Sequence, residues 1–386
     1  MREAAVEIRV MQTCVMEVIG RSRPQPEPLF TAERAPLKVR DRFLDLLRLV
    51  SVLRVVALHT CTKPPVVYLP WIQWIFPGMP EVFFVSGAVT AAALRRRPPL
   101  QVVGKRLRRL FPPYVVYAVV ALAVMTITDL RSSSPAASLD RGDWLSFVFP
   151  VVRPTGSQTR VILWGHLWFL TAFLWVIALS PLTYWLHRRL KASSLLVPGL
   201  LFLLVVVADK RQLFAVREEM YNVTMFAWFF QLGYLYDDGT LQRLKVRTHM
   251  IMATVLGASG WLVAERIEPV WRKSLNELYS SQTGHLLIGA AWMFLAFGLR
   301  VPITQWLQRH RARFVDVVTQ RTYTLFIWGP AANAVAMAAS RKIGGDGGSR
   351  PVYFAVTAVM LAGLVLCFGF IEDWASSRPP RFLPAT

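Results

Sequence analysis

Three ionisable residues lie inside one apolar stretch near the start of the chain, "LLRLVSVLRVVALHT" (46–60). They are Arg48, Arg54 and His59, and ionisable side chains within a membrane-spanning helix are costly and usually functional. His59 follows Arg48 by eleven residues. A helix therefore places the two side chains within about 20° of each other and about 16 Å apart along its axis. Arg54 lies about 120° away from Arg48, and the pattern assigns it no role.

This spacing predicts one helix face with a fixed cation near a membrane surface and a titratable imidazole deeper in. Neutral imidazole is a suitable general base near pH 7, and arginine binds phosphate groups. Asp45, one turn before Arg48, is expected to pair with it. Structural alternatives stay open: Arg48 could extend to the lipid headgroups, and His59 could be a buried histidine bonded to a neighbouring helix.

The composition indicates that these residues belong to a membrane protein. The chain has 386 residues, 54% of them hydrophobic and 17% charged, with a mean hydropathy of +0.40, whereas soluble domains have about 25% charged residues. The apolar residues form long runs, so we expect an all-α, polytopic membrane protein with about ten spans. They are 43–62, 80–94, 111–128, 161–186, 194–208, 221–236, 249–264, 284–299, 322–340 and 352–371.

The net charge of +21 is explained better by membrane topology than by nucleic-acid binding, because the basic residues cluster in short loops. The bias is clearest at "RRRPPLQVVGKRLRR" (95–109) and predicts cytoplasmic termini and a multi-pass protein of the plasma membrane. We expect a disordered cytoplasmic tail (1–39), a transmembrane domain (40–373) and a short cytoplasmic tail (374–386), with an outer interfacial segment at 66–79. The scattered cysteines and histidines predict no metal site.

Five segments in order resemble the membrane acyltransferase 3 family. In that family the first helix carries an arginine, ten residues and then a histidine, and Arg48 and His59 match this spacing. Ten helices is also the usual number in the family. The matching segments are "RDRFLDLLRLVSVLRVVALH" (40–59), "MPEVFFVSG" (79–87), "RLRRLFPPY" (106–114), "HLWFLTAFL" (166–174) and "QLGYLYDDG" (231–239).

The resemblance implies acyl transfer, with acetyl as the expected group, from cytoplasmic acyl-CoA to a hydroxyl of a carbohydrate, glycolipid or secreted small molecule. It implies His59 as general base, and the cations that would bind acyl-CoA are Arg48, Arg106 and Arg109. Acyl-CoA is then a co-substrate and no bound cofactor is expected. Membrane lipid surrounds the protein, and the oligomeric state is left open.

Four further residues are candidates for orienting or binding the acceptor. Asp45 is one of them. Glu81 begins the second span and either orients His59 or binds acceptor hydroxyls, or is simply an acidic residue favoured at a helix N-terminus. His166 opens the fourth span beside Trp168, as a second proton carrier or as an interfacial histidine. The pair Ser86–Gly87 is expected to serve helix packing, and no serine, histidine and acid pattern is readable.

The chain departs from the family pattern at three positions. Glu81 and Arg54 stand where apolar residues are usual. The segment "RTYTLFIWGP" (321–330) resembles a late helix of the family, but Gly329 stands where a second histidine is common. Because intramembrane charges also mark transport paths, a transporter of a small solute or envelope precursor is the alternative function.

Overall fold

The computed structural model describes residues 41–61, 78–131, 139–157, 160–267, 282–310, 315, 318–345 and 348–380. The chain divides into two units, Met1–Asp41 and Arg42–Thr386, and the helices below belong to the second. The expected tail at 1–39 and nearly all of the expected interfacial segment at 66–79 lie outside the described residues.

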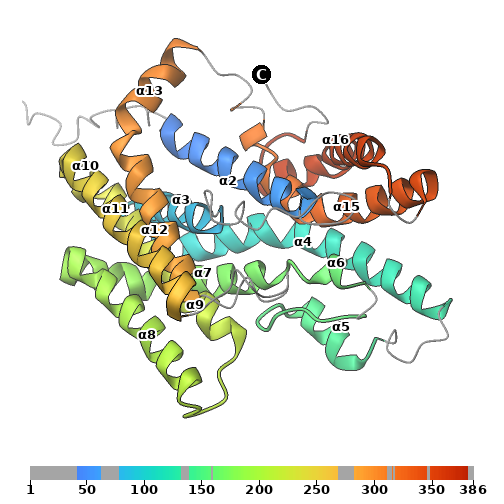
Figure 1. Ribbon diagram of the computed structural model, residues 1–386, viewed down its shortest axis with the longest axis horizontal. Helices are drawn as coiled ribbons and strands as arrows, with labels where there is room; N and C mark the ends of the chain where they lie inside the picture. The colour runs from blue at the N-terminus through green and yellow to red at the C-terminus, as the bar shows by residue number, and fades with distance from the viewer. Residues whose placement is uncertain are drawn as a thin grey trace, which may run out of the picture. The chain divides into compact units, whose positions relative to one another are not determined.

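The described part of the chain is helical, without a strand (Figure 1), which confirms the predicted all-α class. Nine of the expected spans each coincide largely with one helix, whereas the span expected at 161–186 is divided by a turn at 165–167 into α6 (Val161–Trp164) and α7. These helices are α2 (Arg42–Cys61), α3 (Met79–Leu94), α4 (Pro99–Leu130), α7 (Trp168–Leu190), α8 (Leu196–Lys210), α9 (Glu218–Asp237), α11 (Val246–Leu262), α12 (Gln282–Gly298), α15 (Thr322–Gly344) and α16 (Arg350–Ala375). Shorter helices, which we did not expect, are α5 (Arg141–Val148), α10 (Thr240–Arg243) and α13 (Arg300–Arg309).

Three helical segments in the described ranges are long and apolar enough to cross a membrane: Pro99–Leu130, Val161–Lys210 and Arg350–Ala375. The second runs from α6 through α7 and the 3₁₀ turn η4 (Lys191–Leu195) to the end of α8. Helices α12 and α13 meet at 58° and would add a fourth span if they act as one bent helix. These apolar helices indicate a membrane protein, while the number of ten spans and the side of the termini stay predictions.

The basic segment 95–109 is only partly a loop, which corrects the sequence interpretation. Helix α4 begins at Pro99, because proline suits the first turn of a helix and the following residues include good helix formers such as leucine, lysine and arginine. Pro112 and Pro113 lie inside α4 without ending it. Arg106 and Arg109 therefore project from the same helix as the predicted third span.

Helices α3 and α9 pack with their backbones almost in contact. A Cβ atom at Gly87 would lie 1.9 Å from the carbonyl oxygen of Phe230, and one at Gly233 would lie 2.3 Å from the carbonyl oxygen of Phe84. Such distances leave room for glycine only, as in closely packed membrane helices. The expectation that Ser86–Gly87 serves helix packing is confirmed for Gly87.

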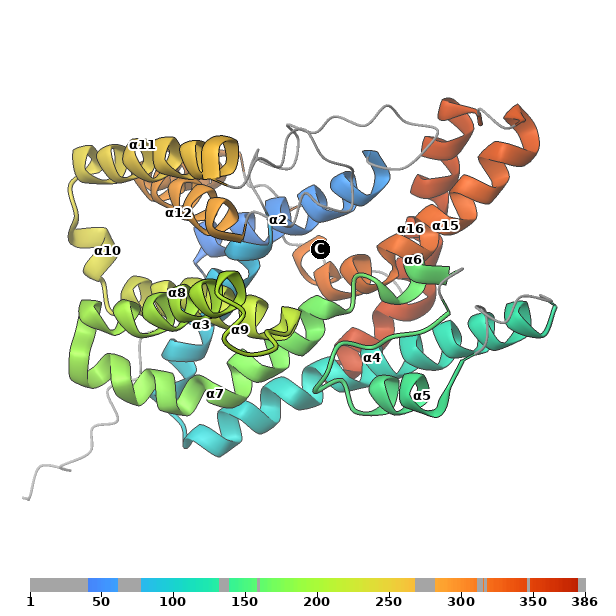
Figure 2. The ribbon, with the colours of Figure 1, turned by 60° about the horizontal axis from the view of Figure 1, so that its bottom comes forward.

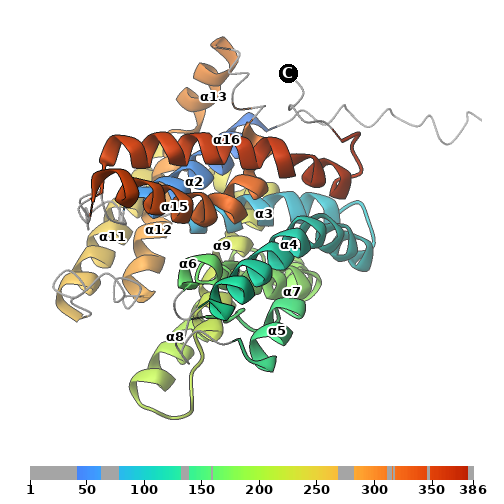
Figure 3. The ribbon, with the colours of Figure 1, turned by 90° about the vertical axis from the view of Figure 1, so that its right-hand side faces the viewer.

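Helices α15 and α16 lie side by side (Figure 3), and α11 lies along α12 (Figure 2). A buried ion pair joins α16 to the residue preceding α15, with Arg321 Nη2 2.6 Å from Asp373 Oδ2. Arg321 also donates to the Gly369 carbonyl. Next to this pair, Glu372 accepts hydrogen bonds from the backbone N–H (3.2 Å) and hydroxyl (3.0 Å) of Thr324. These bonds fix a carboxylate at the end of an apolar helix.

Candidate active site

Helix α2 carries Arg48, Arg54 and His59, and these residues contribute to the walls of two cavities. We call the cavity lined by Arg48 the arginine cavity and the cavity lined by His59 the histidine cavity. Helix α2 packs against α3 and α15, so both cavities are enclosed by helices that are distant in sequence.

The arginine cavity, together with the open space at its mouth, contains about 750 Å³ that is free of protein atoms. Its cations are Arg48 from α2 and Arg106 and Arg109 from α4. Much of the remaining wall is apolar or aromatic, including Phe169 and Phe173 of α7. The structure therefore brings together the three arginines that the resemblance assigned to acyl-CoA. A cavity with cations beside an apolar wall suits a ligand that joins phosphate groups to an uncharged chain.

Glu372 of α16 also lines the arginine cavity, and sequence reasoning missed it. Its Oε1 atom lies 3.8 Å from Nη2 of Arg109, and the side chain is 2% exposed. The signal in the sequence was "FIEDW" (370–374), an acidic pair directly after an apolar run. The expected last span, 352–371, ends just before this pair, but acidic residues buried in a membrane domain usually have a function.

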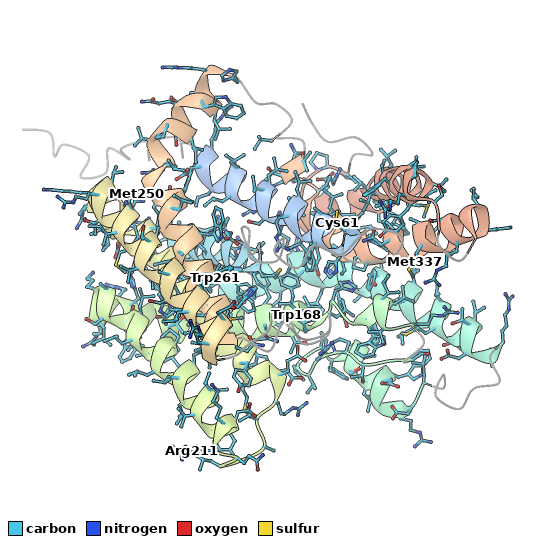
Figure 4. The ribbon with its side chains drawn as sticks, in the orientation of Figure 1. Cys61, Trp168, Arg211, Met250, Trp261 and Met337 are labelled. Carbon is cyan, nitrogen blue, oxygen red and sulfur yellow. The ribbon has the colours of Figure 1, made fainter. Side chains whose placement is uncertain are left out.

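The histidine cavity, together with the open space at its mouth, contains about 690 Å³ that is free of protein atoms. It includes three residues predicted for the acceptor side: His59 from α2, His166 from the turn before α7, and Trp168, labelled in Figure 4. His59 and His166 are close enough to interact electrostatically. The lining also includes Arg54 and His285, for which the sequence supported no role.

His166 is held in a defined orientation against α15. The residue is 6% exposed, and its Nε2 atom lies 3.2 Å from the carbonyl oxygen of Ile327. A carbonyl can only accept, so Nε2 donates and the neutral ring carries its lone pair on Nδ1. The same ring meets Phe326 at 6.3 Å between centroids. These contacts join the start of α7 to α15 between the two cavities.

Phe326 of α15 lines both cavities. It is 8% exposed, and its ring centroid lies 4.3 Å from that of Phe169, which faces the arginine cavity. The Phe326 ring also meets the ring of His166, which lines the histidine cavity. One aromatic side chain therefore belongs to the wall between the predicted donor residues and the predicted acceptor residues.

Three singled-out positions lie outside the lining of both cavities. Asp45 is half-buried in the first turn of α2. Glu81 is fully buried in the first turn of α3 and interacts electrostatically with Arg54. A Cβ at Gly329 would meet Val56 of α2 at an ordinary 3.7 Å. The two charges that depart from the family pattern, Arg54 and Glu81, are therefore neighbours in the fold.

A serine, histidine and acid arrangement does occur, contrary to what the sequence indicated. His187 Nε2 lies 3.0 Å from Asp238 Oδ2, and His187 Nδ1 lies 3.3 Å from Ser194 Oγ. Ser194 is fully buried and lines neither cavity, so a substrate cannot reach it. These bonds instead connect the C-terminal ends of α7 and α9, and a covalent mechanism through Ser194 remains disfavoured.

The comparison with protein families decides the assignment, because the acyltransferase domain model of the acyltransferase 3 family matches residues 41–369. The chain belongs to this family. No curated protein and no solved structure matched the chain. In this member of the acyltransferase 3 family, most of the cavity lining lies within the matched range. Among the ionisable lining residues in the described part of the chain, Glu372 alone lies beyond that range.

Proposed function

We propose that this acyltransferase-family protein moves an acyl group, acetyl foremost, from acyl-CoA in the arginine cavity to a hydroxyl group in the histidine cavity. The supporting observation is that residues expected on the donor side and on the acceptor side line two different cavities, and that Phe326 lines both. The proposed acceptor is a carbohydrate, a glycolipid or a secreted small molecule.

On the donor side, the phosphate groups of coenzyme A would pair with Arg48, Arg106 and Arg109. Guanidinium groups bind phosphate through paired, charge-assisted hydrogen bonds. Glu372 would then hold Arg109 in place rather than contact the phosphates, because like charges repel. The acyl thioester would extend along the apolar wall towards Phe326.

On the acceptor side, His59 would act as general base. Its neutral imidazole removes the proton of the acceptor hydroxyl as the oxygen attacks the thioester carbonyl carbon. The C–O bond forms, the C–S bond breaks, and the coenzyme A sulfur leaves as a thiolate that takes up a proton. The products are an ester and free coenzyme A. His166, oriented by Ile327, would support His59 as a second proton carrier.

The proposed setting is the plasma membrane, with about ten spans and both termini in the cytoplasm. Support comes from the helices that coincide with the ten expected spans and from the excess of lysine and arginine in the loops assigned to the inner side. In this orientation the arginine cavity serves the cytoplasmic side, where acyl-CoA is available.

The test uses membranes that contain the full-length protein and acetyl-CoA labelled in its acetyl group. We expect label to pass to an acceptor, and we expect His59→Ala to abolish the transfer because the base is lost. His310→Ala is the matched control, since His310 is an exposed histidine at the end of α13 and lines neither cavity.

Full transfer by a folded His59→Ala protein would refute the role of His59. Uptake of a solute into vesicles without any transfer of label would refute the enzyme and favour the transporter.

A further inference from the structure

Three side chains that line the arginine cavity each carry a buried polar atom without a hydrogen-bond partner in the described part of the chain. These atoms are Ser86 Oγ of α3, Tyr323 Oη of α15 and Glu372 Oε1 of α16. The Ser86 residue is 6% exposed and Glu372 is 2% exposed. A buried polar atom that lacks a partner lowers stability. Three such atoms at one cavity therefore indicate a ligand that bonds to them.

Glu372 shows which part of a ligand this wall can accept. Its Oε2 atom accepts both hydrogen bonds from Thr324. Its Oε1 atom lies 3.8 Å from Nη2 of Arg109, which is too far for a hydrogen bond. A carboxylate repels phosphate groups, so this part of the wall suits an uncharged part of the ligand. The Oε1 atom needs an N–H or O–H donor from that part.

Tyr323 lies next to Glu372 and on the way to the wall between the two cavities. It precedes Phe326 by three residues, so both lie on one side of α15, about 4.5 Å apart along the helix axis. Tyr323 also interacts electrostatically with Glu372. These two residues therefore occupy the wall between Arg109 and Phe326.

The hydroxyl groups of Ser86 and Tyr323 complement the carboxylate. Each hydroxyl can donate a hydrogen bond to a carbonyl oxygen, whereas a carboxylate accepts only. The cavity thus offers donors and an acceptor on a wall that also contains apolar side chains such as Val82 and Phe169. Few polar groups on an apolar wall are typical of sites that orient a small molecule.

We propose that Ser86, Tyr323 and Glu372 form a subsite for the pantetheine arm of acyl-CoA. This arm is the uncharged chain between the phosphate groups and the thioester, and it contains two amide groups and a hydroxyl group. Its N–H or O–H groups would donate to Glu372, and its carbonyl oxygens would accept from Ser86 and Tyr323. The inference rests on the proposed acyl transfer and adds a second recognition element to the donor site. Glu372 lies beyond the residues matched by the family model.

The experiment tests the two halves of coenzyme A separately. Membranes with the full-length protein transfer label from acetyl-CoA, and either pantetheine or adenosine 3′,5′-bisphosphate is added as a competing inhibitor. We expect both halves to compete with acetyl-CoA in wild type. Tyr323→Phe should raise the inhibition constant of pantetheine about fivefold, the effect of one lost hydrogen bond. The inhibition constant of the bisphosphate should stay at the wild-type value.

Tyr353→Phe is the matched control for this variant. The Tyr353 hydroxyl is also buried without a hydrogen-bond partner in the ranges that the structure describes, but the residue lines neither cavity. Tyr353→Phe should therefore leave both inhibition constants unchanged. Ser86→Ala should behave like Tyr323→Phe, whereas Ser259→Ala, at an exposed position of α11, should behave as wild type.

Glu372→Gln separates direct binding from an effect through Arg109. Pantetheine has no phosphate group, so a displaced Arg109 cannot weaken its binding by loss of an ion pair. We expect Glu372→Gln to raise the inhibition constant of pantetheine at least fivefold, because a hydrogen bond to a charged acceptor is lost. Arg109→Gln should show the opposite pattern, with a rise for the bisphosphate and little change for pantetheine.

The outcomes distinguish this subsite from the proposed reaction. If pantetheine did not inhibit wild type, or if Tyr353→Phe raised its inhibition constant as much as Tyr323→Phe, the subsite would be overturned. A rise for the bisphosphate alone would place these side chains at the nucleotide end and would also overturn it. Any one of the three residues whose variant leaves the pantetheine constant unchanged is removed from the subsite. If membranes transferred no label from acetyl-CoA, the proposed acyl transfer itself would fall.

Discussion

Phe326→Ala should change which acyl groups the protein transfers. Phe326 is buried and belongs to the wall between the arginine cavity and the histidine cavity. Its ring packs on Phe169 at 4.3 Å and meets His166 at 6.3 Å. Removal of the ring would open space at the point that the acyl chain reaches in the proposed reaction.

The size of the effect follows from the apolar surface that a longer chain would bury. Each methylene group buried contributes about 0.8 kcal/mol, and a butyryl chain has two more than an acetyl chain. The variant should therefore favour butyryl-CoA by about 1.6 kcal/mol more than wild type does. This corresponds to about a 15-fold change in the ratio of the two kcat/KM values.

The assay is competition between acetyl-CoA and butyryl-CoA, with full-length protein and a common acceptor. Truncation of a buried phenylalanine costs about 3–5 kcal/mol of stability, so a second variant must report general damage. Phe202→Ala serves this purpose, because Phe202 is 3% exposed in α8 and lines neither cavity. An unchanged ratio in folded Phe326→Ala, or an equal change in Phe202→Ala, would refute the reasoning.

Two further predictions concern the helix packing and the donor side. Gly233→Ala should lower stability in detergent by about 1–3 kcal/mol, because its Cβ would lie 2.3 Å from the carbonyl oxygen of Phe84. Thermal melts should show that Gly257→Ala melts at the wild-type temperature, since its Cβ meets the nearest atom at 3.5 Å. Equal melting temperatures for Gly233→Ala and Gly257→Ala would contradict the close packing of α3 and α9. Arg109→Gln should raise the KM for acetyl-CoA about tenfold, whereas Arg108→Gln, at an exposed position on the same helix, should not. Equal KM values in the two variants would remove Arg109 from the donor site.

The sequence predicted the helices well because each apolar run is a local property. Runs of about 20 apolar residues indicate a helix wherever their partners lie, and all ten expected segments coincide largely with helices. One error is the turn at 165–167, which interrupts the span expected at 161–186. Others occurred where polar residues continue a helix. Helix α4 begins at Pro99, in a segment that its charges had suggested was a loop, and α16 extends past the expected last residue to Ala375.

The candidate site was predictable on one helix and unpredictable across helices. Helical geometry relates Arg48 to His59, but no periodicity shows that Arg106 lies across a cavity from Arg48. Arg54 and Glu81 show the same limit: the sequence did not relate these two charges to each other, and the fold makes them neighbours. Glu372 was missed because an acidic residue directly after an apolar run looks the same whether it meets water or an arginine of another helix.

The shared wall at Phe326 has an electrical consequence. In the proposed orientation the arginine cavity opens to the cytoplasm, and if the histidine cavity opens to the other side, water could approach the ring from both sides. The insulating layer at this point would then be about one aromatic side chain thick rather than the roughly 30 Å of a lipid core. Most of the membrane voltage would fall across that ring, where a unit charge changes energy by about 2.3 kcal/mol per 100 mV. Any proton passed between the cavities during turnover would therefore make the reaction rate depend on the membrane potential.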